Sequence, residues 1–370
     1  MKLLFCLITL LFLVSCGTQT RKTEVNFLEA SKVTAEKKWE EETKKWIETK
    51  KWIDDSYRLE TVSSKILAGN AKYCEQLKYT EGYIGIRYWS KHNFEEKWQD
   101  VASSRFGLTD EVRLYLVHPG SPAAGAGLKV NDVVLAINNQ PIQKGKKAIT
   151  DVDEKLKKFA HAGGRLTFAL RRGEENHELS VTPSLRCRGK VILTDDNSIT
   201  SDVDNEGIKV SKGLVQFFED DDEIAAVISH EIAHNLSKNY GQNILYSALL
   251  GFLGFSAGFG IDVVWLIATG QLTTAFAEGF GSMGIETGQK IGRVKSEQQA
   301  DYIGLHLMAM AGYDIERAPI FWRRVANIEI ERIQKNMRDV HPIPDSRIPD
   351  MEATVKKIKE KLQEGLLVFP

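Results

Sequence analysis

The sequence feature that most constrains this chain is the run His230-Glu231-Ile232-Ala233-His234. Apolar residues recur around it at helical spacing, so we predict a helix that begins near Asp222. A spacing of four residues places both imidazoles on one helical face, where they can bind one Zn²⁺ at about 2.0–2.1 Å. Glu231 lies beside them and can accept the proton of a metal-bound water. The fold must therefore bring a further ligand back to this helix.

Two carboxylates further along the chain can complete such a site. A catalytic zinc needs a third protein ligand and one open position. Glu297 and Asp301 lie four residues apart in a helix-like stretch, so they share one face. Glu297 can complete a site with two histidines, and Asp301 can accept the outer N–H of a ligating histidine and fix its tautomer. The alternative is an ordinary pair of carboxylates on a surface helix.

From about residue 190 to residue 350, these motifs resemble those of the M48 family of zinc peptidases, in the same order. The resemblance includes residues 210–214, where a strand enters a helix, and the run 341–347, His-Pro-Ile-Pro-Asp-Ser-Arg. It implies a mainly helical zincin domain of the gluzincin type, which binds one Zn²⁺ per chain and hydrolyses peptide bonds. It also implies that His341 is a switchable ligand or hydrogen-bond donor near the metal and that Arg347 stabilises the oxyanion. Asn235 would orient the site or bind the substrate backbone, although an exposed helix residue needs no function.

The same resemblance implies a mechanism and a place for the substrate. Glu231 takes the proton of a zinc-activated water and returns it to the leaving amine. The strand over residues 208–210 is expected to be the edge strand on which an extended substrate lies, so recognition rests mainly on backbone hydrogen bonds. His341 as a fourth ligand would instead hold the enzyme latent.

A small β-rich module is expected over residues 79–185. Strand-like and turn-like segments alternate there, and residues 119–142 strongly resemble the bacterial PDZ pattern. By that resemblance, Tyr83-Ile84-Gly85-Ile86 is the loop whose N–H groups bind a peptide C-terminus, and the adjoining strand accepts the peptide as an added strand. Residues 151–161 would form the helix on the other side of the groove. A groove filled by the protein's own chain is the alternative.

The N-terminus resembles a bacterial lipoprotein signal. One positive charge precedes an apolar run over residues 3–14 that is too short to span a bilayer. Leu13-Val14-Ser15-Cys16 resembles a lipobox, so we expect residues 1–15 to be removed and Cys16 to carry a lipid anchor. This predicts a periplasm-facing protein of the bacterial cell envelope. The residue after the anchor is Gly17 rather than Asp, which favours the outer membrane if the host is Gram-negative. An ordinary signal peptide with an incidental cysteine is the alternative.

Two cysteines, Cys74 and Cys187, remain if Cys6 leaves with the signal and Cys16 is lipidated. In an oxidising compartment, two thiols suggest one disulfide. Such a bond would tie the beginning of the PDZ-like stretch to its end. Two buried free thiols are the alternative.

Residues 16–78 are expected to hold the anchor, a linker and a charged helix. The tripeptide Lys-Lys-Trp occurs three times between residues 37 and 52, and Trp39, Trp46 and Ile53 lie seven residues apart, which is helical spacing. The helix would be a stalk, pack on the rest of the protein, or lie on an anionic membrane surface. Across the chain, 49 basic and 50 acidic residues nearly cancel, which argues against a nucleic-acid-binding polyelectrolyte.

An apolar, glycine-rich segment over residues 244–281 departs from a simple soluble fold. Residues 244–261 carry no charge, and Asp262 separates them from a second apolar run. Length alone would permit a membrane span. We favour a lid or a re-entrant hairpin over the site. Asp262 and the glycines argue against a membrane span, and the chain must bring His234 and Glu297 back to the same metal. A buried helix pair and true transmembrane helices are the alternatives.

Together these features predict an α+β chain with an N-terminal helix, a small β-rich PDZ domain over residues 79–185 and a helical zinc peptidase domain over residues 186–370. The expected function is that of a zinc endopeptidase that hydrolyses misfolded or misassembled envelope proteins. Its partners would be peptides or unfolded proteins, protein C-termini at the PDZ groove and the membrane, but no nucleic acid. The alternative is a latent or non-catalytic PDZ adaptor or chaperone with a zinc site.

Overall fold

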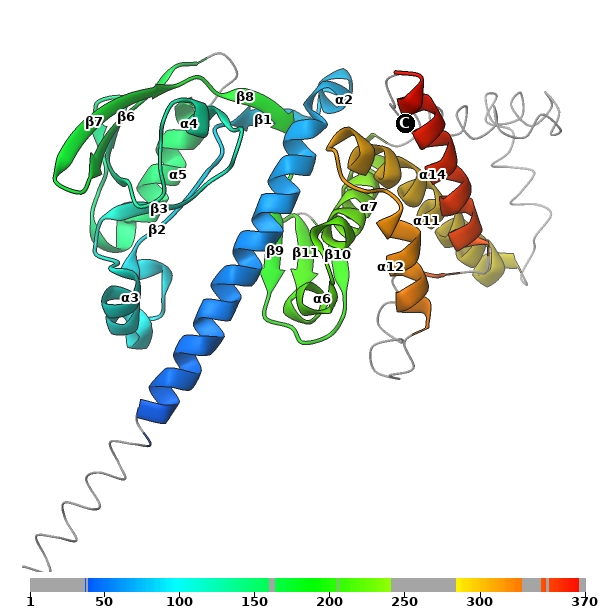
Figure 1. Ribbon diagram of the computed structural model, residues 1–370, viewed down its shortest axis with the longest axis horizontal. Helices are drawn as coiled ribbons and strands as arrows, with labels where there is room; N and C mark the ends of the chain where they lie inside the picture. Colours follow the sequence, from blue (N-terminus) through cyan, green and yellow to red (C-terminus); the bar gives the residue numbers. More distant parts are fainter. Residues whose placement is uncertain are drawn as a thin grey trace, which may run out of the picture. The chain divides into compact units, whose positions relative to one another are not determined.

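Figure 1 shows a computed structural model of the chain. It describes residues 37, 39–159, 164–204, 206–240, 284–327, 341–343 and 346–365. The chain divides into two units, Met1–Asp54 and Asp55–Pro370. The predicted signal peptide, the lipid anchor at Cys16 and the apolar segment 244–281 lie outside the described residues. Among the helices that are described, none has the length and apolar character needed to cross a membrane.

The described part of the first unit is a charged helix over residues 39–54. Lys45 pairs with Glu41, and Lys50 pairs with Asp54, each across one helical turn. Such pairs stabilise an exposed helix by about 0.2–0.5 kcal/mol each. Trp39 is 65% exposed. The helix predicted from the spacing is present, and its role as a stalk or as a membrane contact stays a prediction.

The second unit begins with a helix over residues 55–69 that packs into the larger of two hydrophobic cores. Leu59, Val62 and Ile66 are buried and recur at helical spacing. Asn70 follows the helix, and its side-chain amide donates to the carbonyls of Ile66 and Leu307. The short helix α2 (Ala71–Gln76) comes next. This part of the charged region therefore packs on the rest of its own unit.

The β-rich module has a six-stranded sheet and a core of its own. The strand order is β2-β3-β4-β6-β7, with β5 paired to β4, and every pairing is antiparallel. Buried residues alternate along β3 and β6, as expected for strands with one face on a core. The strands are β2 (Ile86–Trp89), β3 (Val112–Val117), β4 (Val133–Ile137), β5 (Gln140–Pro141), β6 (Leu166–Arg172) and β7 (Glu175–Val181), and the helices are α3 (Gln99–Phe106), α4 (Pro122–Gly125) and α5 (Ala148–Phe159).

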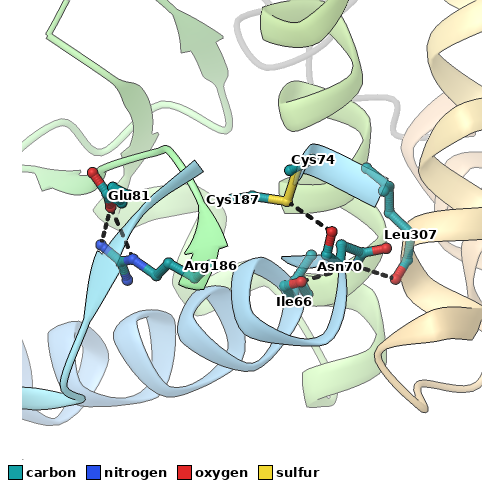
Figure 2. Close-up of a disulfide and its surroundings, with 7 residues drawn as sticks. All are labelled: Ile66, Asn70, Cys74, Glu81, Arg186, Cys187 and Leu307. Carbon is teal, nitrogen blue, oxygen red and sulfur yellow. Dashed lines mark hydrogen bonds and ion pairs between the residues drawn. A yellow bond between two sulfur atoms is a disulfide. The ribbon is translucent and has the colours of Figure 1, made fainter. Parts of the chain in front are cut away.

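A two-stranded ribbon connects this module to the segments before and after it. Strand β1 (Thr80–Tyr83) pairs antiparallel with β8 (Ser184–Cys187). Figure 2 shows the Cys74–Cys187 disulfide at one end of the ribbon and the ion pair between Glu81 and Arg186 along it, with 2.7 Å between Oε1 and Nη2. Of the two alternatives for these cysteines, the structure contains the disulfide.

A three-stranded sheet follows, made of β9 (Val191–Thr194), β10 (Ser201–Val203) and β11 (Ile208–Ser211). Its strand order is β10-β11-β9, and β11 runs antiparallel to β10 and parallel to β9. The prediction that residues 208–210 form the edge strand is wrong, because β11 is paired on both sides. Strand β10 is an edge strand of this sheet, and it contacts the helix that carries the two histidines.

The remaining elements are helices: α6 (Lys212–Phe217), α7 (Asp221–Tyr240), α11 (Gly284–Met310), α12 (Arg317–Ala326) and α14 (Arg347–Gln363). Figure 1 shows the last four gathered together, and α7 packs on α11 and α12 while α14 packs on the same two helices. Gly304 allows α11 to approach α7 closely, since a Cβ atom there would lie 3.1 Å from the backbone nitrogen of His230. The predicted α+β fold, with a helical domain after a small β-rich one, is confirmed.

Candidate metal centre

Four side chains converge between α7, α11 and the segment before α14. His230, His234, Glu297 and His341 each offer one ligand atom, and these atoms all lie within 4.8 Å of one another. We refer to these residues as the four-residue cluster. Three are the ligands predicted from the sequence, and His341 joins them as a fourth donor. Imidazole nitrogens and carboxylate oxygens are among the ligand atoms that bind Zn²⁺ in proteins.

The distances within the cluster show that its donor atoms point toward a common centre. Nε2 of His230 lies 3.1 Å from Nε2 of His234. The two carboxylate oxygens of Glu297 each lie 3.2 Å from one of these nitrogens. Nδ1 of His341 lies 3.3 Å from Nε2 of His230 and 3.1 Å from Glu297. This donor set fits a single zinc ion.

The start of α7 is fixed by a buried charge network. Glu223 in its first turn has no exposed surface and pairs with Arg317 at 3.0 Å and with Arg324 at 2.6 Å, both on α12. A carboxylate near a helix N-terminus also interacts favourably with the helix dipole. These contacts tie α7 to α12 and so orient the turn that carries the histidines.

Asp301 lies behind the cluster and orients one histidine. Its Oδ1 atom is 2.9 Å from Nδ1 of His230, so an Nδ1–H that donates here leaves Nε2 free to face the centre. Burial raises the pKa of Asp301, but the charge of Arg347 and the hydrogen bond from His230 outweigh burial and hold the pKa below its ordinary value. The carboxylate is therefore ionised and ready to accept this hydrogen bond.

Arg347 is fully buried and binds the two carboxylates of α11. Its Nε and Nη2 atoms donate to Asp301 at 2.6 and 2.9 Å. Its Nη1 atom donates to the carbonyl of Pro342 at 3.0 Å and lies 3.3 Å from Glu297. These contacts differ from the oxyanion contact suggested by the sequence. They favour a role in which Arg347 holds Asp301 and Glu297 in place.

The general base predicted from the sequence, Glu231, lies beside the cluster and is 1% exposed. Ser201 of β10 donates to its Oε1 atom at 2.7 Å, and Nε2 of His341 lies 3.1 Å from the same oxygen. Burial raises the pKa of Glu231, but the charge and hydrogen bond of His341 outweigh burial and lower the pKa to about 2. Glu231 is therefore ionised near neutral pH and able to accept a proton. Sequence reasoning missed Ser201, because a lone serine in a short strand carries no signal.

The predicted carboxylate-binding loop, Tyr83-Ile84-Gly85-Ile86, connects β1 to β2. Gly85 has a φ of +84°, and a Cβ atom there would lie 2.2 Å from Cβ of Ser121, so only glycine fits. Carbonyls of the loop accept hydrogen bonds from the backbone N–H groups of His118 and Ala123. These bonds fix the shape of the loop, and binding of a peptide C-terminus there stays a prediction.

Asn235, directly after His234, faces a large cavity. Its Oδ1 atom accepts a hydrogen bond from the Tyr79 hydroxyl at 3.3 Å. It also lines a cavity of about 860 Å³ together with residues of β2, α5 and β10. The position is compatible with the predicted contact to a substrate backbone.

Comparisons with known proteins agree with the two resemblances. Residues 201–355 match the family model described as Peptidase family M48, and residues 114–172 match that of the PDZ domain. The resemblances inferred from the motifs are thus confirmed. The first match includes every residue of the four-residue cluster, together with Glu231, Asp301 and Arg347.

Curated relatives match part of the chain. Mitochondrial metalloendopeptidase OMA1 of Schizosaccharomyces pombe is 29% identical over 157 residues, which is 42% of this chain and 41% of that protein. The Beta-barrel assembly-enhancing protease of Yersinia pestis is 25% identical over 158 residues, which is 41% of this chain and 31% of that protein. The chain thus spans less than half the length of these relatives.

Among solved structures, the HtrA3 PDZ domain bound to a phage-derived ligand matches 29% of this chain and 88% of that chain. The sequence identity is 19% and the TM-score is 0.22.

Proposed function

Since residues 201–355 form a peptidase family M48 domain and residues 114–172 a PDZ domain, we propose that this chain is a zinc-dependent endopeptidase of the bacterial cell envelope. The observation that carries the proposal is the convergence of His230, His234 and Glu297, with the ionised carboxylate of Glu231 beside them. A structural zinc site normally has four closed ligands and no adjacent general base. This arrangement therefore favours catalysis.

The reaction we propose is metal-assisted hydrolysis of a peptide bond. His230, His234 and Glu297 would hold the ion. When bound, Zn²⁺ lowers the pKa of a coordinated water and polarises the scissile carbonyl. Glu231 takes the proton of that water and then gives it to the leaving amine. Ser201 holds the carboxylate of Glu231, while Asp301 holds the imidazole of His230.

Strand β10 is the better candidate for the substrate strand. It is an edge strand, and Ser201 at its start contacts Glu231, so a peptide paired with β10 passes beside the general base. Pairing through the backbone imposes little demand on side chains but requires an extended chain. This suits misfolded or misassembled proteins as substrates. The PDZ domain would bind their C-termini, and a lipid at Cys16 would hold the protein on the membrane.

One observation favours a second candidate, a latent or non-catalytic adaptor. His341 lies 3.1 Å from Glu297 and 3.3 Å from His230, so it can act as a fourth donor to the same ion. Four protein ligands would leave no open position for water. In that state the chain would bind polypeptides through its PDZ domain without cutting them.

The test is cleavage of casein by the purified full chain in mild detergent. Fluorescein-labelled casein is incubated with the zinc-loaded protein, with the protein treated with a chelator, and with the treated protein after zinc is added back. We expect the zinc-loaded protein to cleave casein, the chelator-treated protein to leave it intact, and cleavage to return when zinc is added back. Intact casein despite one bound zinc per chain would favour the adaptor instead.

A further inference from the structure

A large aromatic side chain lies beside the four-residue cluster without being one of its members. Trp322, on α12, is 1% exposed and is among the largest fully buried side chains in the described part of the chain. The centroid of its ring lies 5.2 Å from that of His230 and 5.9 Å from that of His341. An indole N–H is a donor only and does not bind a metal ion. Any effect of Trp322 on the ion is therefore indirect.

The same indole contacts Arg347. The guanidinium carbon of Arg347, which is fully buried, lies 4.2 Å from the centroid of the Trp322 ring. A cation within about 6 Å of an aromatic ring is attracted to its face, most strongly to that of tryptophan. Arg347 in turn binds Asp301 and Glu297. Trp322 thus supports the arginine that holds both carboxylates.

These contacts form a closed circuit of four side chains, one from each of α7, α11, α12 and α14. His230 is hydrogen-bonded to Asp301, and Asp301 accepts two hydrogen bonds from Arg347. Arg347 packs on Trp322, and Trp322 packs on His230. Ring centroids about 4.5–7 Å apart are typical of aromatic pairs in contact. His230 is thus held in two places, at Nδ1 by a hydrogen bond and at its ring by the indole.

The space around this circuit is almost full. A small pocket of about 10 Å³ is lined by His230, Asp301 and Trp322, with alanine, glycine, leucine and methionine residues of the same four helices. A pocket of that size holds at most about one water molecule. His230 and Asp301 therefore have little room to shift while the indole is present. A smaller side chain at residue 322 would give them that room.

The residue before Trp322 offers a matched control. Phe321 is also fully buried and lies on the same helix. Successive residues of a helix point about 100° apart. The ring of Phe321 packs on those of Phe217 and Phe218, with centroids 6.1 and 5.4 Å away. Among the described contacts of these two rings, only those of Trp322 reach His230 and Arg347.

We propose that Trp322 is a positioning residue of the zinc site. Its indole holds the ring of His230 and the guanidinium of Arg347 in the arrangement that binds the ion. This inference rests on the proposed function, because it takes His230 as a zinc ligand. Residues that orient metal ligands from outside typically change metal affinity or activity by about 10–100-fold when they are replaced. Loss of the indole should therefore weaken zinc binding by a factor in that range.

The experiment measures the Kd for zinc of the purified full chain in mild detergent, by competition with a chromogenic chelator. Trp322→Phe keeps a ring, whereas Trp322→Met places a flexible apolar chain without a ring at the same position. Phe321→Met removes the neighbouring ring instead. Compared with the wild type, the Kd should rise by about 10–100-fold in Trp322→Met and by about threefold in Trp322→Phe. It should stay unchanged in Phe321→Met.

Wild-type zinc affinity in a folded Trp322→Met would overturn the inference, and so would an equal loss of affinity in Phe321→Met. The melting temperature of each zinc-free protein shows whether it is folded. If Trp322→Met does not fold, Trp322→Phe decides, and a Kd equal to that of Phe321→Met would overturn the inference. Binding is measured without cleavage, so a wild type that binds zinc but leaves casein intact would contradict the proposed function alone.

Discussion

The hydroxyl of Ser201 donates a hydrogen bond to Oε1 of Glu231 at 2.7 Å, and both side chains are buried. Nε2 of His341 lies 3.1 Å from the same oxygen. Within the described part of the chain, Oε2 of Glu231 has no corresponding partner. Strand β10 thus holds one carboxylate oxygen of Glu231, and in the proposed mechanism the other oxygen takes the proton.

Ser201→Ala should lower kcat by about tenfold, the factor expected for one hydrogen bond to a charged group, with little change in KM. The carboxylate would still be present but less well oriented. Ser201→Thr keeps the hydroxyl and should retain most of the activity. Steady-state kinetics on a fluorogenic peptide measure both, with zinc content determined for each protein. A wild-type kcat in Ser201→Ala would contradict this role.

Removal of the metal should destabilise the wild type but not a variant that cannot bind it. Zinc that binds only the folded state raises the apparent stability by mass action. His234→Ala removes one ligand, so its Tm should no longer respond to a chelator. Differential scanning fluorimetry with and without EDTA checks this, with His177→Ala on β7 as the control that should behave like wild type. An equal response in His234→Ala would place the ion elsewhere.

Loss of the disulfide should lower the free energy of unfolding substantially. Cys74 and Cys187 are separated by 113 positions in the sequence, and closing a loop of that size contributes about 3–5 kcal/mol in the chain-entropy view. The double variant Cys74→Ser, Cys187→Ser should therefore unfold at lower urea concentration. A reducing agent should shift the wild-type transition in the same direction and leave the variant unchanged. Coincident curves for variant and wild type would contradict a role in stability.

The buried His118 should make the protein less stable in mild acid. Burial, followed by the charges of Arg87 and Arg186, lowers its pKa from 6.5 to about 4. The unfolded chain binds a proton below pH 6.5 that the folded chain accepts only near pH 4. The neutral, buried His118 therefore leaves the free energy of unfolding at its full value above pH 6.5. That free energy decreases by up to about 3 kcal/mol as the pH falls from 6.5 toward 4.

His118→Leu should remove part of this acid sensitivity. In the described part of the chain, neither ring nitrogen of His118 has a hydrogen-bond partner, so leucine sacrifices no such bond. Urea unfolding at pH 7.5 and 4.5 should show a smaller difference between the two pH values in the variant than in wild type. The same difference in both proteins would show that His118 does not titrate in this window.

The candidate ligands could be predicted from the sequence because their chemistry is local in two helices. His230 and His234 share a turn, and Glu297 shares a face with Asp301, so helical periodicity alone determines the geometry of each pair. That the two helices meet depends on Gly304, whose missing side chain lets α11 contact the backbone of His230. A glycine within a helical pattern does not by itself indicate which helix it will contact.

The proposed substrate strand could not be predicted in the same way. Residues 208–210 have the apolar pattern of a strand, but that pattern does not reveal how many neighbours the strand has. In the structure, β9 pairs with one side of β11 and β10 with the other. Strand β10 is only three residues long, which gives too little periodicity to identify it. Ser201 was missed for the same reason, since its role depends on contacts across the fold.

The most direct test of the central claim compares Glu231→Gln with the wild type for two properties, zinc content and cleavage of casein. Glutamine keeps the size of the side chain and an oxygen that can accept from Ser201, but it cannot take a proton from water. We expect one zinc per chain in both proteins and cleavage only by the wild type. Cleavage at the wild-type rate by Glu231→Gln, with its zinc in place, would contradict it.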